Sequence, residues 1–493
     1  MKSAKFFSYL GKLQKKEMTR FCDFAASPYY NKHRELRKFI WYCGKIYPHF
    51  EAHKIAKEQV YREVFGKGPF DDGKLAPLLT YAQRLLEAFL AQEQFREQAF
   101  FQDLFLLKGL REKALHPLYE KRLNQARETI EDHKDSAFDR LFQGCLLHRE
   151  ALEYRNQTEQ HEDEAFFEAK QHNLDNFYIL EKLRDGCETL VRQRLLRTGL
   201  MPRLLPALLE EIDRSPERYF AVPAIEAYYR IYLMLSAGDI PAYHEAREAL
   251  LRNESYFSRE DLIFMYNYLM NFCIGKINLG EHLFLEEVFS LYQFQLEKAL
   301  LLEDGILSEW DYKNIVTTGI RLGRLDWTLS FIETYKGFLP PDSMDNAYRF
   351  NLASCCYAMG QYPRVLDLLI QVEYSDLRYS LGAKALLLRT YYDMEAYEAL
   401  FSLADAFRQY LQRNELLADT RRTGYRNLLK FTRKAAHLRS RLDFLKKEKA
   451  KAEFLKIKND AAATPDIFNK PWLEEKFREL EVLLFGATRQ IRV

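Results

Sequence analysis

Residues 352–370 read LASCCYAMGQYPRVLDLLI, and residues 386–407 read LLLRTYYDMEAYEALFSLADAF. In each stretch apolar residues recur at steps of three and four, the spacing of one helix face, on both sides of a short break. The break falls at Gly360 in the first stretch and at Glu395 in the second. Each stretch therefore predicts two helices joined by a tight turn, and the second stretch repeats the pattern of the first.

Helical spacing continues outward from these stretches, from about residue 120 to residue 420, with short interruptions such as SAGDIP, LEDG and FLPPDS. The 20 Gly and 15 Pro make up about 7% of the 493 residues, roughly half the usual share. So few turn-forming residues leave little room for the many turns of an all-β protein. The sequence predicts an all-α protein, with an irregular helical bundle as the alternative to a regular repeat.

The two quoted stretches resemble the tetratricopeptide repeat, a helix pair with a period of 34 residues. Tyr362 and Tyr397 occupy the same place in the repeat and lie 35 residues apart. The frame is degenerate, because Val365 and Leu400 stand where the family has a small residue. An earlier unit, at residues 315–332, fits the same frame through Ile315, Gly319, Gly323 and Thr328.

This resemblance implies a right-handed superhelix of helix pairs. An isolated pair cannot bury both of its faces, whereas stacked pairs can, so stacking is physically favoured. The resemblance also implies that the concave surface of the repeats binds a protein or peptide partner. We therefore expect a non-enzymatic adaptor or scaffold.

Three parts are predicted along the chain: a helical N-terminal module at residues 1–100, tetratricopeptide-like repeats at 101–420, and a basic long helix with a capping helix at 421–493. Residues 71–105 have the pattern of one amphipathic helix capped by Asp71 or Asp72, which joins the module to the repeats. The seam of the basic helix follows steps of three and four through Leu428, Phe431, Ala435, Leu438, Leu442 and Leu445.

The N-terminal module contains three predicted helices, within residues 27–50, 56–66 and 74–90. Their order is similar to the helical part of the winged-helix module that precedes tetratricopeptide repeats in certain bacterial transcriptional activators. The third helix offers Lys74, Gln83 and Arg84 as contacts, and no β-hairpin wing is evident after it. The segments SPYYNK, VYREVFGKGPFDD and KPWLEEKFREL are also similar to a set of helical-repeat proteins of Bacteroidota, which implies no activity.

Charge is distributed unevenly. Residues 1–60 hold 13 Lys and Arg against 5 Asp and Glu, and residues 421–458 hold 14 against 3. Because the whole chain carries +2, the remainder carries −17, which predicts a partner of the repeats with a basic or mixed segment.

The basic ends are either solvated helix faces or contacts to an acidic partner. The candidate contacts are Arg34, Arg37, Lys38, Lys74, Arg84, Arg421, Arg422, Lys446 and Lys447. A nucleic-acid-binding regulator that uses the N-terminal module is thus the alternative function.

A phosphate-binding loop is the first chemical motif to consider, because GPFDDGK at residues 68–74 has its Gly and Lys spacing. Leu75 stands where a Ser or Thr must hold magnesium, and Asp71 and Asp72 would repel phosphates. The segment is better explained as a capped turn that begins a helix.

No other motif predicts chemistry. His161, Glu164, Glu168 and His172 fall on one face of a predicted helix, but one helix cannot surround a metal ion. The adjacent Cys355 and Cys356 fall on a packing face, where a core role is expected. We expect no catalytic, cofactor or metal site.

The seven cysteines are odd in number and contain no CxxC pair, which fits a reducing compartment. No apolar run approaches the roughly 18 residues of a membrane span. The sequence therefore predicts a cytoplasmic protein with no membrane partner.

Overall fold

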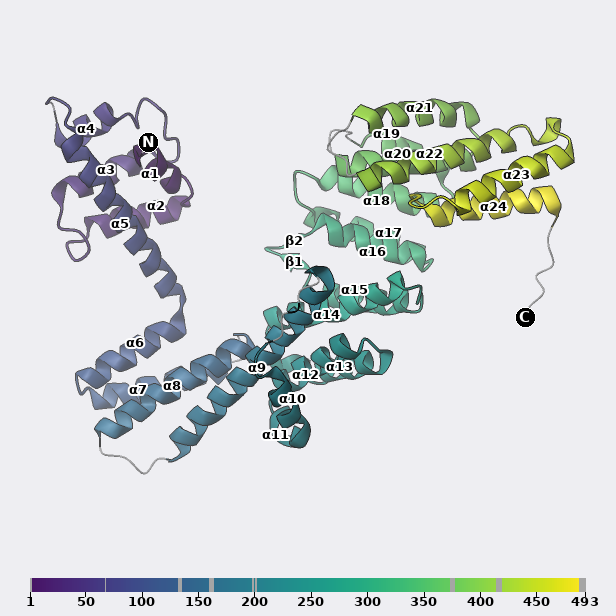
Figure 1. Cartoon of the computed structure of the whole chain (residues 1–493). Helices are drawn as coiled ribbons and strands as arrows, with labels where there is room; N and C mark the ends of the chain where they lie inside the picture. Colours follow the sequence, from purple (N-terminus) through teal and green to yellow (C-terminus); the bar gives the residue numbers. More distant parts are fainter. Residues whose placement is uncertain are drawn as a thin grey trace. The chain divides into compact units, whose positions relative to one another are not determined.

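The computed structural model describes residues 2–66, 68–131, 135–158, 164–196, 199, 202–372, 377–413 and 419–486. The structure is 80% helical, and its described residues contain 24 α-helices and one hairpin of two short strands (Figure 1). The predicted all-α class is confirmed. The repeats and their superhelical arrangement stay predictions.

The chain divides into two compact units. The N-terminal unit comprises Met1–Tyr232 and Asn253–Ser258, and the C-terminal unit comprises Leu233–Arg252 and Arg259–Val493. The finer division at residues 100 and 420 stays a prediction. The helices up to the boundary are α1 (Lys2–Leu10), α2 (Lys15–Ala26), α3 (Arg34–Ile46), α4 (Lys57–Phe65), α5 (Asp72–Glu97), α6 (Ala99–Glu112), α7 (His116–Glu131), α8 (Ala137–Gln157), α9 (Glu164–Leu196), α10 (Leu205–Arg214), α11 (Pro216–Phe220), α12 (Pro223–Ala237) and the 3₁₀-helix η1 (Glu254–Tyr256).

A separate hydrophobic core lies among α1 to α5 and extends in sequence from Phe6 to Phe89. The sequence pattern does not predict α1, whose apolar run is short, yet Phe6, Phe7 and Leu10 are buried in this core. The helices α3, α4 and α5 follow in the order that the winged-helix resemblance implies, and Asp71 caps α5 as predicted. No strand lies in the described residues of this module, and the resemblance stays a prediction.

The single helix predicted for residues 71–105 is wrong. The chain leaves helical geometry at Gln98, with φ −96° and ψ 77°, so α5 ends and α6 begins there. The apolar residues on the two sides of Gln98 serve different cores. Those of α5 pack in the first core, whereas Phe100, Leu107 and Leu110 of α6 pack in a second core with α7 and α8.

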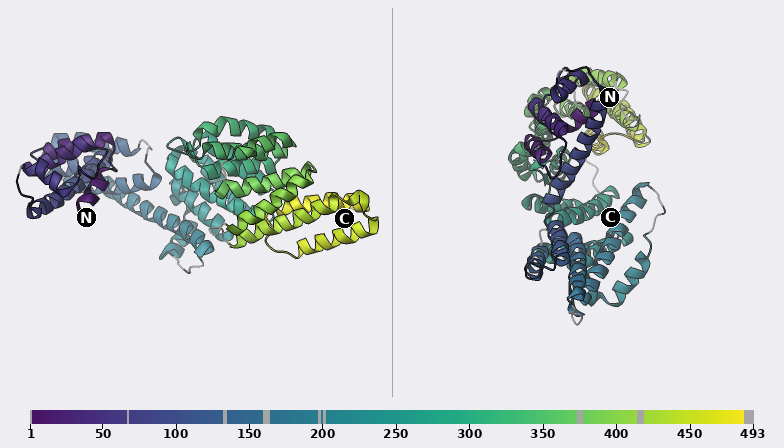
Figure 2. Two further views of the ribbon diagram at one scale, coloured as in Figure 1. Left: turned by 90° about the horizontal axis from the view of Figure 1, so that it is seen from above. Right: turned by 90° about the vertical axis from the view of Figure 1, so that its left-hand side faces the viewer.

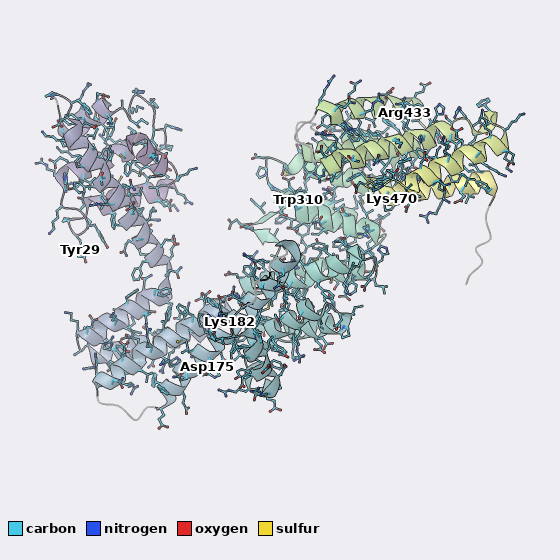
Figure 3. The ribbon with its side chains drawn as sticks, viewed as in Figure 1. Tyr29, Asp175, Lys182, Trp310, Arg433 and Lys470 are labelled. Carbon is cyan, nitrogen blue, oxygen red and sulfur yellow. The ribbon has the colours of Figure 1, made fainter. Side chains whose placement is uncertain are left out.

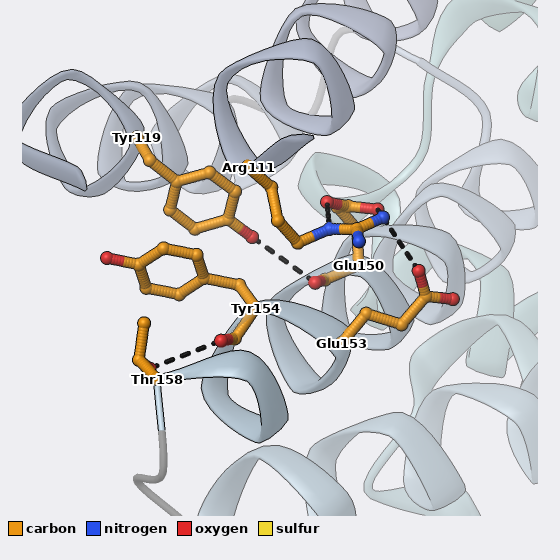
Figure 4. A network of polar contacts seen from close by, with 6 residues as sticks. All are labelled: Arg111, Tyr119, Glu150, Glu153, Tyr154 and Thr158. Atoms are coloured by element: carbon orange, nitrogen blue, oxygen red, sulfur yellow. Dashed lines mark hydrogen bonds and ion pairs between the residues drawn. The ribbon is translucent and has the colours of Figure 1, made fainter. Parts of the chain in front are cut away.

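A buried ion pair links α6 to α8 in this second core (Figure 4). The Arg111 Nε lies 2.6 Å from Glu150 Oε1, and each side chain is only 8% exposed. Arg111 Nη2 also bonds to Glu153 Oε2 at 2.8 Å. Tyr119 donates a hydrogen bond to the Glu150 carbonyl and its ring stacks on Tyr154, with centroids 3.8 Å apart. The bond to Glu150 raises the pKa of Arg111, so this charge is permanent.

The C-terminal unit consists of successive helix pairs and a final three-helix cluster (Figures 1 and 2). Its elements are α13 (Ile240–Arg252), α14 (Arg259–Asn278), α15 (Phe284–Glu297), β1 (Leu302–Glu303), β2 (Ile306–Leu307), α16 (Glu309–Arg321), α17 (Leu325–Tyr335), η2 (Lys336–Phe338), α18 (Met344–Ala358), α19 (Tyr362–Ile370), α20 (Leu377–Asp393), α21 (Tyr397–Arg413), α22 (Asp419–Arg439), η3 (Leu442–Phe444), α23 (Lys447–Ala462) and α24 (Lys470–Phe485). The strands form an antiparallel hairpin whose turn residues, Asp304 and Gly305, both have positive φ.

Three helix pairs, α16–α17, α18–α19 and α20–α21, turn in the same way. Gly323, Gly360 and Glu395 all have left-handed φ, at 69°, 73° and 56°. At each turn the amide of the next residue donates to a carbonyl five positions earlier, as from Gln361 to Cys356 at 2.9 Å. The first helix of each pair also contacts the first helix of the next, α16 with α18 and α18 with α20.

The basic C-terminal segment forms two helices, and the prediction of one long basic helix is wrong. Leu428, Phe431, Ala435 and Leu438 are buried on α22, but Leu442 and Leu445 lie in the turn that follows it. Both leucines still pack against the core of this unit, because the chain folds back and lays α23 against α22. The closing helix α24 contacts both, and its Trp472 and Phe477 are buried in the same core.

Within the described ranges no helix combines the length and apolar character that crossing a membrane would require.

Packing between Gly319 and Thr328 gives a first prediction. A Cβ added at Gly319 would overlap the hydroxyl of Thr328, which is fully buried and donates to the Arg324 carbonyl. Gly319→Ala is therefore expected to destabilise the C-terminal unit by roughly 1–3 kcal/mol. With Thr328→Ala present as well, the loss should be smaller than the sum of the two single losses. Urea denaturation followed by circular dichroism measures the four proteins.

Gly275→Ala on α14 is the matched control, because nothing lies within 4 Å of the added Cβ. This change should stabilise the unit by up to about 1 kcal/mol through helix propensity. If the losses of unfolding free energy for Gly319→Ala and Thr328→Ala add up in the double variant, residues 319 and 328 are not in contact.

The buried ion pair gives a second prediction. Arg111→Met leaves the Glu150 carboxylate buried without its main partner, and should cost about 3–5 kcal/mol of unfolding free energy. Arg111→Met with Glu150→Met should cost less than Arg111→Met alone, since no charge is then left buried. Arg192→Met is the control, because the Arg192–Glu188 pair is exposed and should be worth less than about 1 kcal/mol. If Arg111→Met and Arg192→Met lower the free energy of unfolding equally in urea denaturation, the Arg111–Glu150 pair is not desolvated.

Candidate functional site

The C-terminal unit contains a pocket of about 480 Å³. Side chains from α16, α18, α20 and α22 line it, together with Phe468 and Asn469 just before α24. Figure 3 labels Trp310 on α16 and Lys470 at the start of α24. Volumes of roughly 300–1,000 Å³ are typical of pockets that hold ligands.

The first helices of the pairs supply this lining because each has two different sides. On α16, Trp310, Lys313 and Thr317 recur at steps of three and four and reach the pocket. Tyr312 and Ile315, between them in sequence, are fully buried on the other side of the helix. One side of α16 therefore holds the stack together, and the other is left for the pocket.

Aromatic rings form much of the wall. Trp310 is 55% exposed, which is unusual for so large an apolar side chain. Tyr425 of α22 stacks on Phe468, with ring centroids 4.2 Å apart, so the last turn of chain before α24 completes the wall. Phe350 packs edge-on against Tyr379 at 5.8 Å.

Positive charge dominates the lining, which contains Lys313, Arg321, Arg389 and Arg421. Among the described residues none of these four cations forms an ion pair with a carboxylate. Glu309 is the one acidic residue among the described residues of the lining, and it accepts a hydrogen bond from the Tyr379 hydroxyl. The pocket therefore carries an excess of uncompensated positive charge.

Two of the cations show how this charge is held. Arg389 lies over the Tyr357 ring, 4.3 Å from its centroid, and its Nε is buried with no hydrogen-bond partner in the described part of the chain. Tyr357 donates to Asp393, which also pairs with Lys476 at 2.8 Å. Lys313 is half-buried, and this burial lowers its pKa, with a smaller contribution from the charge of Arg421. An anionic ligand would relieve the repulsion between Lys313 and Arg421.

The structure separates the predicted contact residues. Arg421 alone lines the pocket, while the next residue, Arg422, pairs with Asp419 at 3.3 Å. Lys446 and Lys447 are exposed at the start of α23 and lie outside the pocket lining. The predicted contacts of the N-terminal unit are all exposed: Arg34, Arg37 and Lys38 on α3, and Lys74 and Arg84 on α5.

Sequence reasoning missed Trp310, Lys313 and Arg389, although the predicted repeat frame contains a signal for the last two. Lys313, Phe350 and Ala385 each stand two residues before the first apolar position of their predicted repeat unit, and all three line the pocket. The positions two residues after it are Thr317, Ser354 and Arg389, which also line the pocket.

A second, shallower groove of about 370 Å³ lies between α21 and α22. Its lining contains four cations, Arg408, Arg426, Lys430 and Arg433. Asp405 offsets part of this charge, at 2.6 Å from Arg433 and 3.5 Å from Arg408. Among the described residues the cations of the pocket have no such carboxylate, so their positive charge is the less compensated of the two.

Two motifs that the sequence analysis considered, GPFDDGK and the Cys355–Cys356 pair, have structural roles. Asp71 accepts from the Gly73 amide and Asp72 pairs with Lys57, so GPFDDGK begins a helix. Cys355 and Cys356 are fully buried, and burial raises the pKa of the Cys355 thiol to about 11. Both thiols belong to the core.

His161 of the predicted metal stripe lies outside the described residues. The described residues contain no group of three or more His, Cys, Asp or Glu able to hold a metal ion. His172 instead bonds to Asn176 one turn along α9.

No family model matches the chain, and neither a curated protein nor a solved structure is similar to it.

The repulsion between Lys313 and Arg421 gives a third prediction. The pKa of Lys313 should lie below the 10.5 of an ordinary lysine, and Arg421→Gln should raise it because a neighbouring positive charge is removed. The rise should be partial, since burial is the larger cause. Carbon-13 NMR of reductively methylated lysines across pH 8–12 measures the pKa.

Arg422→Gln is the matched control for Arg421→Gln. It removes the same charge one residue away, but from a side chain that lies outside the pocket lining and pairs with Asp419. It should leave the pKa of Lys313 unchanged. A Lys313 pKa above 10.5 would contradict the arrangement, because it would require a carboxylate nearby.

Proposed function

We propose that the chain is a non-enzymatic adaptor whose C-terminal pocket binds an acidic segment of a protein partner. The observation that carries this proposal is the set of four cations, Lys313, Arg321, Arg389 and Arg421, that line one pocket and pair with no carboxylate in the part of the chain that the structure describes. Charge-assisted hydrogen bonds from such groups to carboxylates are about twice as strong as neutral ones. A ligand with carboxylates would supply the missing counter-charge.

The aromatic wall supports a peptide with apolar side chains in addition to acidic ones. Trp310, Phe350 and Phe468 offer ring surface beside the cations. Aromatic residues and arginine are also the side chains that most often dominate the energetics of protein interfaces. The resemblance of this segment to tetratricopeptide repeats supports the same class of partner.

The proposed partner segment is acidic, whereas the sequence predicts a basic or mixed one. The net charge of −17 outside the basic ends predicts a basic or mixed segment. A ligand, however, responds to the groups within a few ångströms of it, because charges beyond about 8 Å are screened at physiological ionic strength. The pocket lining, which is cationic, favours an acidic segment.

A fourth prediction tests this function. Peptide display with the full-length chain as bait should select peptides enriched in Asp and Glu with one or two aromatic residues. Selected peptides, measured by fluorescence anisotropy, should bind at least tenfold more weakly to Lys313→Glu and to Arg421→Glu, and binding should weaken with salt. Arg422→Gln and Lys447→Gln, two cations outside the pocket lining, should change the affinity less than twofold.

Two outcomes would contradict the proposal. One is a selected set with no more Asp and Glu than the starting library. The other is binding that is equally sensitive to Arg421→Glu and Lys447→Gln, which would show a general attraction to the basic surface.

A further inference from the structure

The exposed side of α3 carries an unusual group of side chains, which we call the α3 face: Arg34, Arg37, Lys38, Trp41 and Lys45. Their spacing of three, four, seven and eleven residues from Arg34 places them on one side of the helix. All five are exposed, and Trp41 is 59% exposed. The face extends over eleven residues of helix, or about 16 Å.

The charges of the α3 face are not neutralised within the described part of the chain, where its four cations form no ion pair with a carboxylate. Glu35 lies on another side of the helix and contacts His33 instead. The Lys45 ammonium lies 3.5 Å from the centroid of the Trp41 ring, so a cation and an exposed aromatic surface are adjacent.

The opposite side of α3 is fixed in the core of the module. Leu36, Phe39, Ile40 and Cys43 are buried there. The α3 face therefore cannot turn inward, and α3 has no apolar side left to insert into a lipid surface. A membrane is a poor match for a helix whose only exposed apolar residue is one tryptophan between four cations.

Further exposed aromatic residues adjoin the first turn of α3. His33, which caps the helix, lies against Tyr81 of α5, with ring centroids 5.9 Å apart, and Tyr81 is 45% exposed. Arg84 is exposed one turn after Tyr81. Tyr29, labelled in Figure 3, is 86% exposed in the loop before α3. Exposed aromatic rings and cations thus occur both along α3 and beside its first turn.

We infer that the α3 face and the adjoining Tyr29 and Tyr81 bind single-stranded nucleic acid. Cations neutralise phosphates, and exposed aromatic rings stack on bases, which is the general basis of single-strand binding. Base faces are hidden in a duplex, so exposed rings favour a single strand over a double helix. This inference concerns the N-terminal unit and does not depend on the pocket of the C-terminal unit.

Fluorescence anisotropy of the full-length chain with a labelled 20-nucleotide single strand of thymidine tests the inference. We expect binding at 50 mM KCl that is at least tenfold tighter than binding to a 20-base-pair duplex or to polyglutamate of equal length. The logarithm of the association constant should fall linearly with the logarithm of salt, with a slope of about −3 if four phosphates are neutralised. Arg37→Gln should reduce the slope by about 0.7.

Trp41→Ala separates stacking from charge and should weaken single-strand binding about fivefold or more, whereas Trp41→Phe should retain most of the affinity. Phe444→Ala is the control, because it removes an aromatic ring that is 88% exposed from the other unit, at a residue outside the pocket lining. It should leave the affinity unchanged, as should Lys446→Gln with Lys447→Gln. Unchanged circular dichroism would show that each variant is folded.

Three results would overturn the inference: no binding of the single strand at 100 μM protein and 50 mM KCl; duplex or polyglutamate binding as tight as single-strand binding; or a single-strand affinity that Trp41→Ala leaves unchanged. The last would mean that only charge is involved.

Discussion

A pair of helices has more apolar surface than the two helices can cover for each other, and the C-terminal unit is built around that constraint. Tyr312 and Ile315 of α16 are fully buried because α17 and the next pair both pack nearby. The same need brings α16, α18 and α20 into contact in series. The sides of these helices that do not pack against other helices face one pocket, and their side chains form much of its lining.

The turns between the helix pairs follow closely from local sequence. Gly323 and Gly360 mark turns because left-handed backbone favours glycine, and the frame places Glu395 in the same conformation. Lys313, Phe350 and Ala385 stand at matching positions on the first helices of the three pairs, and all three line the pocket, as do Arg389 and the two residues that match it. Comparing these positions among the pairs therefore identifies them as residues of one surface. Arg421 and Phe468 lie beyond the three helix pairs, so no spacing relates them to the pocket before the chain is folded.

The missed helix ends have a different cause. Apolar periodicity continues through Gln98 and from Leu438 to Leu445, but periodicity does not say which core a residue will join. At Gln98 the apolar residues change cores, and after Leu438 the chain reverses within one core. Net charge likewise does not say where charges will lie in the fold. Most of the chain carries −17, yet the pocket within that part is lined by cations.

The link between Arg111 and Glu150 has a consequence for how the protein is made. The two residues lie 39 positions apart, and α7 lies between their helices. At 5–20 residues per second, Arg111 is synthesised roughly 2–8 s before the carboxylate that will neutralise it. Until then the guanidinium has neither of its carboxylate partners, which both lie on α8. Because a buried charge without a partner is costly, the side of α6 that carries Arg111 is expected to stay hydrated until α8 arrives and supplies both burial and counter-charge.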